Sequence, residues 1–303
     1  MRLALTGSTG LIGSTLVGHF LSKPDTTVIQ VTRRQSVDSA QTSVAVWDPA
    51  KGEIQADKLE GHDAVIHLAG TNVSERWTPS YKKLIESSRI EGTRLLCKTL
   101  AKLRQKPRVL ISASAVGFYG NHEPDKILTE SSALGEGFLP DVCCQWEEET
   151  RYAKEAEIRV VNMRLGVVLG KSGGAMAKML PIFNLGLGGV LGDGNQMMSW
   201  IALPEIPLIV EHLIKNESIA GPVNVVSPQP VSNREFTKIL GEVIRRPVIF
   251  PVPAFGIKLL FGEMGETLLL EGARVSPKKL LESGYSFRYP ELGEALKAAL
   301  DKG

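Results

Sequence analysis

A glycine pattern directly after the first apolar run constrains the fold more than any other feature of this sequence. Leu3–Thr6 is short and apolar, and Gly7, Gly10 and Gly13 follow it as Gly-x-x-Gly-x-x-Gly, while Leu11–Leu21 has helical periodicity. A strand, a glycine turn and a helix in this order predict a dinucleotide-binding unit. Gly7 would permit the tight turn, Gly10 would let the backbone approach a pyrophosphate, and Gly13 would let the helix pack closely. Free amides at the helix N-terminus would then bind the phosphates. An ordinary strand-to-helix turn is the alternative.

The residues that end the second predicted strand indicate the type of dinucleotide. Val28–Val31 is followed by Thr32, Arg33 and Arg34, with no Asp or Glu. A site for NAD places a carboxylate here for the ribose 2′-hydroxyl, whereas guanidinium groups suit the 2′-phosphate of NADP. NADP is therefore the predicted cofactor. The alternative is that both arginines are solvated loop charges.

The first two-thirds of the chain alternate short apolar runs with longer helical patterns. Further strands are predicted at Val44–Trp47, Ala64–Leu68, Val109–Ser112 and Val160–Met163, and a long helix at Tyr81–Leu103. Parallel strands that are apolar on both faces are covered by helices on both sides. We therefore predict an α/β protein with an NAD(P)-binding Rossmann fold, a doubly wound parallel sheet with a smaller, mainly helical C-terminal lobe.

The composition changes after Gly170. Residues 171–194 are rich in glycine and methionine, which predicts an irregular segment whose methionines form either a mobile lid or core. Ser232 and Glu235 fit a capping box that opens a helix to about Arg245, and Ser276 is a candidate N-cap for a later one.

Two unequal and interleaved parts are expected from this pattern. The Rossmann domain takes residues 1–170, with a returning part at about 202–228. Residues 171–201 and 229–303 form the smaller lobe on the substrate side.

Charge and hydropathy narrow the classes of partner. Lys and Arg number 35 against 33 Asp and Glu and are dispersed, so no basic surface for nucleic acid is expected. The most apolar later stretches, Leu180–Gly192 and Trp200–Ile214, are broken well short of the roughly 20 residues that a membrane span needs. Because no basic leader and hydrophobic region stand before Leu3–Thr6, no secretory signal is expected, and the removal of a transit peptide is left open. A small-molecule substrate is the expected partner, and the sequence leaves its identity and the oligomeric state open.

Cysteine and histidine usage indicates the compartment and argues against a metal site. Cys97, Cys143 and Cys144 make a poor disulfide framework, which predicts a reducing, cytoplasmic location. The five histidines have no ligand spacing with the cysteines or with one another, so no metal is expected.

Several segments resemble, in order, the extended short-chain dehydrogenase/reductases of the nucleoside-diphosphate-sugar epimerase type. They are Gly7–Gly13, Asp63–Gly70, Ile111–Gly120, Arg164–Gly170 and Val223–Ser227. A closer resemblance is to an atypical subfamily known as NAD(P)-binding epimerase-family proteins, some of them labelled cell-division-inhibitor-like. It is carried by Trp146-Glu147, Gly173–Met176, Leu185–Gly189, Ser199–Ile201 and, most specifically, Arg274–Glu291.

This resemblance implies a set of cofactor contacts. The contacts to the phosphates would be made by Gly7, Thr9, Gly10, Leu11, Ile12 and Gly13. Thr32 and Arg33 would lie at the 2′-phosphate beside Arg34, and Leu68, Ala69 and Gly70 along the adenosine and ribose. Val168 lies in the segment that resembles the strand end beside the nicotinamide. Arg89 is either a further cofactor contact or a solvent-facing helix charge.

The acid–base pair expected of such a dehydrogenase is missing. That pair is a tyrosine followed four residues later by a lysine, and none of the five tyrosines has a lysine at that position. Ser114 and Tyr119 are the candidate catalytic residues, Ser114 to bind the substrate oxygen and Tyr119 to act as the acid. Asp141, Cys143 and Cys144 are weaker candidates.

Two functions therefore remain open. The first is an NADP(H)-binding oxidoreductase or epimerase-like protein of unknown substrate, with relocated acid–base groups. The second is a non-catalytic NADPH-binding sensor or interaction module.

Overall fold

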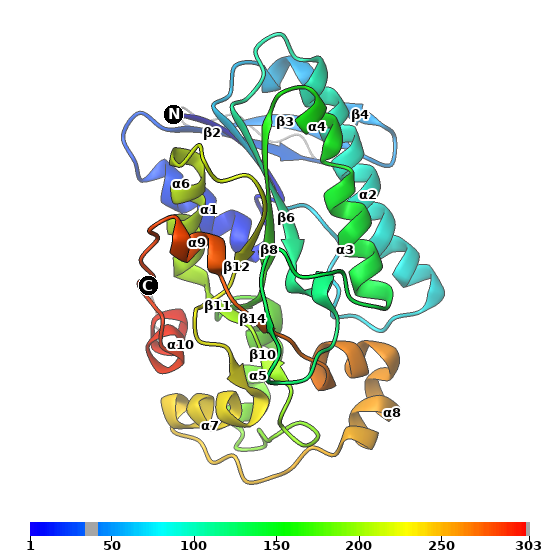
Figure 1. The fold of residues 1–303 in the computed structure, drawn as a ribbon, viewed down its shortest axis with the longest axis vertical. Helices are drawn as coiled ribbons and strands as arrows, with labels where there is room; N and C mark the ends of the chain where they lie inside the picture. The colour runs from blue at the N-terminus through cyan, green and yellow to red at the C-terminus, as the bar shows by residue number, and fades with distance from the viewer. Residues whose placement is uncertain (34–41, 301–303) are drawn as a thin grey trace.

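The computed structural model describes residues 1–33 and 42–300, and a sheet of eight strands forms the centre of its upper part (Figure 1). The strands, in the order in which they pair, are β12 (Gly221–Val225), β8 (Arg159–Leu165), β6 (Val109–Ala115), β5 (Ala64–His67), β1 (Arg2–Thr6), β2 (Thr27–Thr32), β3 (Thr42–Asp48) and β4 (Glu53–Ile54). All neighbours are parallel except β3 and β4. The strand order reverses beside β1, between β1 and β5, which is where ligands bind in sheets of this kind.

Helices cover both faces of this sheet because successive strand residues point to opposite sides. Leu3 and Leu5 belong to a core shared with α1 (Leu11–Leu21) and α6 (Ile206–Lys215), whereas Ala4 belongs to a core on the other face. That second core is completed by α2 (Pro79–Lys102) and α4 (Arg151–Glu155), and α3 (Phe138–Glu148) lies beside α2. The predicted doubly wound Rossmann fold is confirmed.

A second, smaller group of elements lies at the carboxyl ends of the strands, in the lower half of Figure 1. Its core contains Met176, Phe183, Trp200, Phe236 and Leu296. The elements that supply it are β9 (Val167–Leu169), α5 (Gly174–Asn184), β11 (Trp200–Ala202), α7 (Asn233–Ile244) and α10 (Leu292–Leu300). The remaining elements are β7 (Ile127–Leu128), β10 (Met197–Met198), β13 (Val231–Ser232), α8 (Ala254–Gly265), β14 (Arg274–Val275), α9 (Lys278–Glu282) and the short helices η1 (Ala56–Leu59), η2 (Val116–Tyr119), η3 (Leu203–Glu205) and η4 (Glu266–Leu270).

Two local predictions were wrong. Residues 174–184 form the regular helix α5 rather than an irregular segment, because Met176, Leu180 and Phe183 repeat at helical spacing and are buried. The N-cap of α9 is Pro277, not Ser276. The capping box at Ser232 does form, since its hydroxyl accepts a hydrogen bond from the Glu235 amide at 3.2 Å.

Glu205 attaches the C-terminal tail to the sheet. This carboxylate is fully buried and accepts hydrogen bonds from the Tyr285 hydroxyl, the Arg288 amide (3.0 Å) and the Tyr289 amide (2.8 Å). Burial, together with Glu205, raises the pKa of Tyr285. The tail beyond α9 is therefore held by one acidic side chain that lies just before α6.

Candidate functional site

Two of the three glycines in the turn between β1 and α1 are required by the local backbone. Gly7 has a φ of +69°, and a Cβ there would lie 2.9 Å from the carbonyl carbon of Leu68. A Cβ on Gly13 would lie 2.1 Å from the Gly7 carbonyl oxygen. These two glycines are thus required by the fold of the turn itself.

Gly10 is different because the protein does not need a glycine there. Its φ is −78°, it is exposed, and the nearest described atom to a Cβ would be the Gly7 oxygen at 3.4 Å. A position that tolerates a side chain sterically but lacks one leaves room for a bound group. Gly10 is also the N-cap of α1, and no side chain in the described part of the chain caps that helix. The first amides of α1 are therefore not capped by their N-cap residue, and uncapped helix amides are groups that bind a phosphate.

The other predicted phosphate contacts surround this turn. Thr9 is exposed, whereas Leu11 and Ile12 are half-buried. Leu11 lies against the start of α5, since a Cβ on Gly173 would be 3.2 Å from the Leu11 Cβ. Val168, in β9, is half-buried and packs against the core that contains β1.

A buried hydrogen-bond chain fixes the adjacent edge of the crevice. The Thr6 hydroxyl oxygen accepts from the amides of Leu68 (3.1 Å) and Ala69 (3.3 Å) and lies 2.7 Å from His67 Nδ1. His67 Nε2 lies 2.9 Å from the Thr93 hydroxyl of α2. Burial lowers the pKa of His67 to about 4, so the ring is neutral at pH 7. The chain links β1, β5 and α2 and orients the backbone of residues 68–70. Sequence reasoning missed it, although a histidine within an apolar strand was a visible signal.

Arg89 lies next to Gly70. Its guanidinium donates to the carbonyls of Thr71 (3.0 Å) and Ile85 (3.1 Å), and a Cβ on Gly70 would be 3.2 Å from the Arg89 Cζ. Burial lowers the pKa of this guanidinium. Arg89 is therefore a half-buried group that holds the loop after β5, rather than a solvent-facing charge.

At the end of β2, Thr32 is half-buried and Arg33 is exposed. Arg34 lies outside the described residues.

Ser114, at the end of β6, is part of an ion-pair network that the sequence did not reveal. Its hydroxyl donates to Glu147 Oε1 at 2.6 Å, and Arg164 binds both oxygens of that carboxylate, Nε to Oε1 at 2.8 Å and Nη2 to Oε2 at 2.9 Å. Burial opposes the charge of Arg164, but the bonds to Glu147 outweigh it, and the pKa of Arg164 is raised. The Arg164 side chain is 4% exposed and the Glu147 side chain 12%, and Ser114 is 2% exposed as a whole residue. Glu147 is thus the most accessible of these three groups.

Tyr119 lies deeper in the same network. Its hydroxyl donates to Asn224 Oδ1 at 2.7 Å and accepts from Arg164 Nη1 at 3.0 Å, and the ring is fully buried. Burial raises the pKa of Tyr119 despite the nearby Arg164. The structure therefore brings Ser114 and Tyr119 into one network, but it directs the phenol proton to Asn224.

The segment where the family would place its tyrosine and lysine forms α3. Cys143 is buried, and burial raises its pKa to about 12, whereas Asp141 and Cys144 are exposed. A thiol with so high a pKa is neutral at pH 7 and a poor nucleophile.

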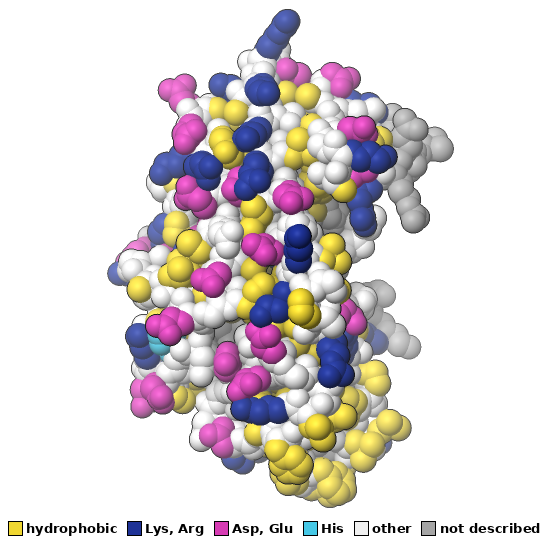
Figure 2. Space-filling model, turned by 90° about the vertical axis from the view of Figure 1, so that its right-hand side faces the viewer, with side chains coloured by type: hydrophobic (Ala, Val, Ile, Leu, Met, Phe, Trp, Pro, Cys, Tyr) yellow, Lys and Arg dark blue, Asp and Glu magenta, His cyan; other side chains and the backbone are white. Residues whose placement is uncertain are grey.

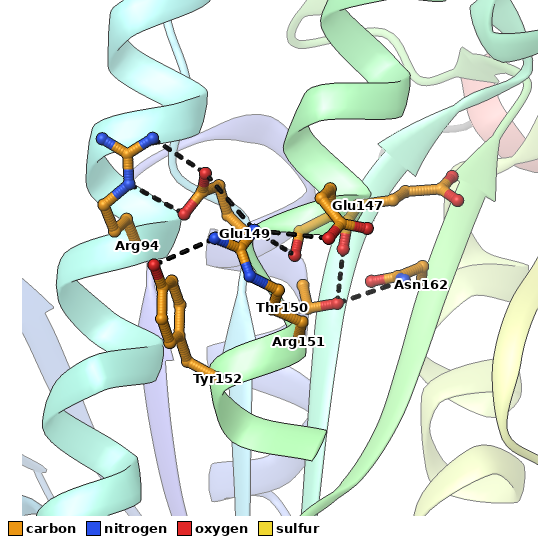
Figure 3. Close-up of polar contacts among 8 residues, drawn as sticks. Arg94, Glu147, Glu149, Thr150, Arg151, Tyr152 and Asn162 are labelled. Atoms are coloured by element: carbon orange, nitrogen blue, oxygen red, sulfur yellow. Dashed lines mark hydrogen bonds and ion pairs between the residues drawn. The ribbon is translucent and has the colours of Figure 1, made fainter. Parts of the chain in front are cut away.

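The end of α3 is fixed to its neighbours by the contacts in Figure 3. Arg94 of α2 binds both carboxylate oxygens of Glu149 at 2.8 Å. The Thr150 hydroxyl donates to the Glu147 carbonyl at 2.6 Å and lies 3.4 Å from the Asn162 amide nitrogen of β8 (Figure 3). The carbonyl of Glu147 is therefore linked to β8 through Thr150, Glu149 is bound to α2, and the Glu147 carboxylate contacts Ser114 and Arg164.

Neither a metal-binding cluster nor a helix long and apolar enough to cross a membrane occurs among the described residues. No three His, Cys, Asp or Glu side chains within residues 1–33 and 42–300 are arranged to hold a metal ion. No described helix combines the length and apolar character needed to cross a bilayer.

The sequence and the fold were compared with those of known proteins, and both match NAD-dependent epimerase-family proteins. The model of the NAD dependent epimerase/dehydratase family matches residues 3–225, and a domain of unknown function (DUF1731) matches residues 252–299. An epimerase family protein of Mycobacterium bovis is 39% identical over 295 residues, which cover 97% of this chain and 96% of that protein. An Arabidopsis thaliana relative, the chloroplastic homolog of epimerase family protein SDR39U1, is 38% identical over 99% of this chain and 87% of its own length. The crystal structure of human epimerase family protein SDR39U1 with NADPH is 31% identical, with a TM-score of 0.88 over 99% of each chain.

Proposed function

The chain belongs to the NAD dependent epimerase/dehydratase family, and from that premise we propose that it binds NADP(H) and acts on a small molecule of unknown identity. The main support for this proposal is the turn at Gly10. A side chain would fit there but is absent, and the N-cap residue of α1 does not cap the helix amides. Arg33 at the end of β2 favours the 2′-phosphate. The human relative whose structure contains NADPH supports the same choice.

The turn would bind the phosphates, and residues 68–70 would line the adenosine side. Arg89 would support the loop after Gly70. NADP(H), when bound, supplies a hydride donor or acceptor.

Glu147 is the best candidate for the acid–base group in place of the missing tyrosine and lysine. It is the most accessible member of the triplet with Ser114 and Arg164, and those two residues fix the position of its carboxylate. We assign Glu147 the role of exchanging a proton with a substrate hydroxyl, and Ser114 and Arg164 the role of holding its carboxylate in position. Tyr119 is assigned a structural role because its proton is bonded to Asn224.

The substrate-side lobe and the location are also proposals. Residues 171–201 and 229–303 would form the lobe that faces the substrate, which is supported by their shared core around Trp200 and Phe236. A cytoplasmic location is supported by the free thiols Cys97, Cys143 and Cys144, although the Arabidopsis relative is named chloroplastic.

Cofactor binding is tested by titrating the protein with NADPH and with NADH and following the fluorescence of the dinucleotide. Gly10→Val should weaken NADPH binding at least about 100-fold, because the added methyl groups occupy the phosphate position. Gly18→Ala is the matched control, since a Cβ at this exposed helix position meets no atom within 4 Å. Arg33→Ala should reduce the preference for NADPH over NADH. Equal NADPH affinity in Gly10→Val and Gly18→Ala would contradict the proposed phosphate site.

The role of Glu147 is tested by consumption of NADPH with a panel of carbonyl compounds and sugar nucleotides. Glu147→Gln should retain NADPH binding and lower kcat by about 100-fold or more. Glu148→Gln, whose side chain is 66% exposed on the same helix, should retain activity. Saturable NADPH binding without turnover of any panel member by the wild type would instead favour the non-catalytic sensor.

A further inference from the structure

Three polar side chains form a row across the sheet beside Glu147. Ser114 of β6, Arg164 of β8 and Asn224 of β12 are register partners, so their side chains point to the same face of the sheet. Ser114 and Arg164 contact the Glu147 carboxylate directly, whereas Asn224 is fully buried and lies one strand further away. The network around Glu147 therefore continues beyond the residues that touch it.

The orientation of Asn224 is fixed by residues 273–279, which contain β14 and which we call the β14 segment. The Nδ2 group of Asn224 donates to the carbonyl of Ser276 at 2.9 Å. Because Nδ2 is bound to the β14 segment, Oδ1 of the same amide is on the opposite side, where it meets Tyr119.

Two buried side chains hold the β14 segment in place. Glu130 Oε1 accepts a hydrogen bond from the amide of Lys279 at 3.2 Å. The Ser199 hydroxyl donates to the Ala273 carbonyl at 2.7 Å and accepts from the Val275 amide at 2.9 Å. The Ser276 carbonyl is therefore part of a backbone that is bonded on both sides of it.

The orientation of Asn224 in turn sets the direction of the Tyr119 hydroxyl. Oδ1 of Asn224 can only accept, so the phenol donates to it, at 2.7 Å. The lone pairs of the phenol oxygen are then free for Arg164 Nη1, which is 3.0 Å away. A reversed amide would present N–H groups to the phenol oxygen and compete with Arg164 for it.

Arg164 depends on these partners because it is buried. Figure 2 shows charged side chains of both signs scattered over one face of the molecule, where water surrounds them. The Arg164 side chain is only 4% exposed, so water cannot replace a lost partner. Glu147 binds one edge of its guanidinium and Tyr119 binds Nη1, while the Phe118 ring lies against its face, 3.4 Å from Cζ to the ring centroid.

We propose that Tyr119 and Asn224 are positioning residues for Glu147. They transmit the hold of the β14 segment to Arg164, which in turn fixes the carboxylate. This inference rests on the proposed function, in which that carboxylate exchanges a proton with the substrate.

The proposal also gives a role to the domain of unknown function that matches residues 252–299, because this range contains the β14 segment. Ser114, Glu147 and Arg164 all lie within residues 3–225, which the epimerase/dehydratase model matches. The C-terminal domain contributes the carbonyl that orients the network behind these three residues.

Hydrogen exchange at Arg164 tests this relay without any substrate. In protein labelled with nitrogen-15 arginine, the Nε–H signal of Arg164 is identified by its loss in Arg164→Lys, and its exchange with water is measured by NMR. Tyr119→Phe should speed this exchange at least about 10-fold, because Nη1 loses its acceptor and the guanidinium is free to shift. Asn224→Leu should have the same effect, since it removes both the acceptor of the phenol proton and the bond to the β14 segment.

Ser199→Ala is the matched control. Ser199 is buried and makes two hydrogen bonds to the β14 segment, and among the described contacts it is bonded to neither Asn224 nor Tyr119. Its loss should destabilise the protein but change the exchange at Arg164 by less than about 2-fold. An NADPH affinity equal to that of the wild type shows that each variant is folded.

The relay and the proposed function can fail separately. Exchange at Arg164 that is unchanged in Tyr119→Phe, or that Ser199→Ala speeds as much as Tyr119→Phe does, would overturn the relay. With a substrate from the NADPH-consumption panel, Tyr119→Phe should also lower kcat about 10-fold and leave KM nearly unchanged, and an unchanged kcat would equally count against it. Absence of turnover bears on the proposed function alone, because the exchange at Arg164 is measured without substrate.

Discussion

His67 makes the stability of the protein depend on pH at the scale of a single residue. The ring is fully buried between Thr6 and Thr93, and its pKa is about 4 in the folded chain against about 6.5 for an exposed histidine. The unfolded chain therefore binds a proton more readily between these two values, and stability falls as the pH falls through that window.

As the pH falls from 7 to 5, we expect protonation of His67 in the unfolded chain to lower the free energy of unfolding by about 2 kcal/mol. Urea denaturation at several pH values measures it. His67→Gln should flatten this part of the pH dependence, whereas His122→Gln at a half-exposed histidine should not. An identical slope in the wild type and His67→Gln would show that the proton is taken up elsewhere.

Residues whose role is local were predictable, and residues whose role is set by distant partners were not. The positions of Gly7, Gly10 and Gly13 follow from one strand, one turn and one helix within the first 21 residues. Glu147 gains its importance from Ser114, 33 residues earlier, and Arg164, 17 residues later. No spacing rule connects such a triplet, because only the pairing of β6 with β8 and the packing of α3 bring the three side chains together.

At the scale of elements, glycine content misled the interpretation of residues 171–194. The glycines flank α5 rather than interrupt it: Gly173 and Gly174 stand at its start, and Gly186 follows its end. The apolar spacing inside the helix was the better guide, but Pro181 and the flanking glycines obscured it. Strands β1, β2, β3, β5, β6 and β8 were predicted within a few residues because buried parallel strands form nearly continuous apolar runs, whereas the two-residue antiparallel strand β4 was not predicted.

The attachment of the tail to η3 gives a prediction for one short element. Glu205→Ala removes the acceptor of the Arg288 and Tyr289 amides and should destabilise the protein by about 3 kcal/mol. Tyr285→Phe removes one donor and should cost about 1 kcal/mol. Urea denaturation measures both, and limited proteolysis should cleave the tail faster in Glu205→Ala. Glu217→Ala, at an exposed position, is the control, and an equally small effect of Glu205→Ala would contradict the proposed anchor.

At the scale of the whole molecule, elements of the central sheet and elements of the lower core alternate along the chain. The sheet receives β12 only after α5, β10 and β11 have contributed to the lower core, and that core then needs α7 and α10. A simple division of the sequence would therefore leave both cores incomplete.

A chain that ends after Ser227 should consequently not fold as a separate unit. It would expose Met176, Phe183 and Trp200, each worth roughly 2 kcal/mol of burial. We expect it to lack the cooperative thermal transition of the full chain when followed by circular dichroism. Residues 228–303 supplied as a second chain should restore the transition in part. A cooperative transition of the shortened chain within about 5 °C of the full chain would show that the sheet is autonomous.

The position of β12 at one edge of the sheet also sets an order of events during synthesis. Strands β1 to β8 leave the ribosome before Gly221–Val225, so one edge of β8 is unpaired for as long as residues 166–225 take to be made. Synthesis at about 5–20 residues per second makes that interval several seconds. Unpaired parallel edges are templates for association with other chains. We therefore expect β8 of the nascent chain to be open to association with other chains until β12 pairs with it.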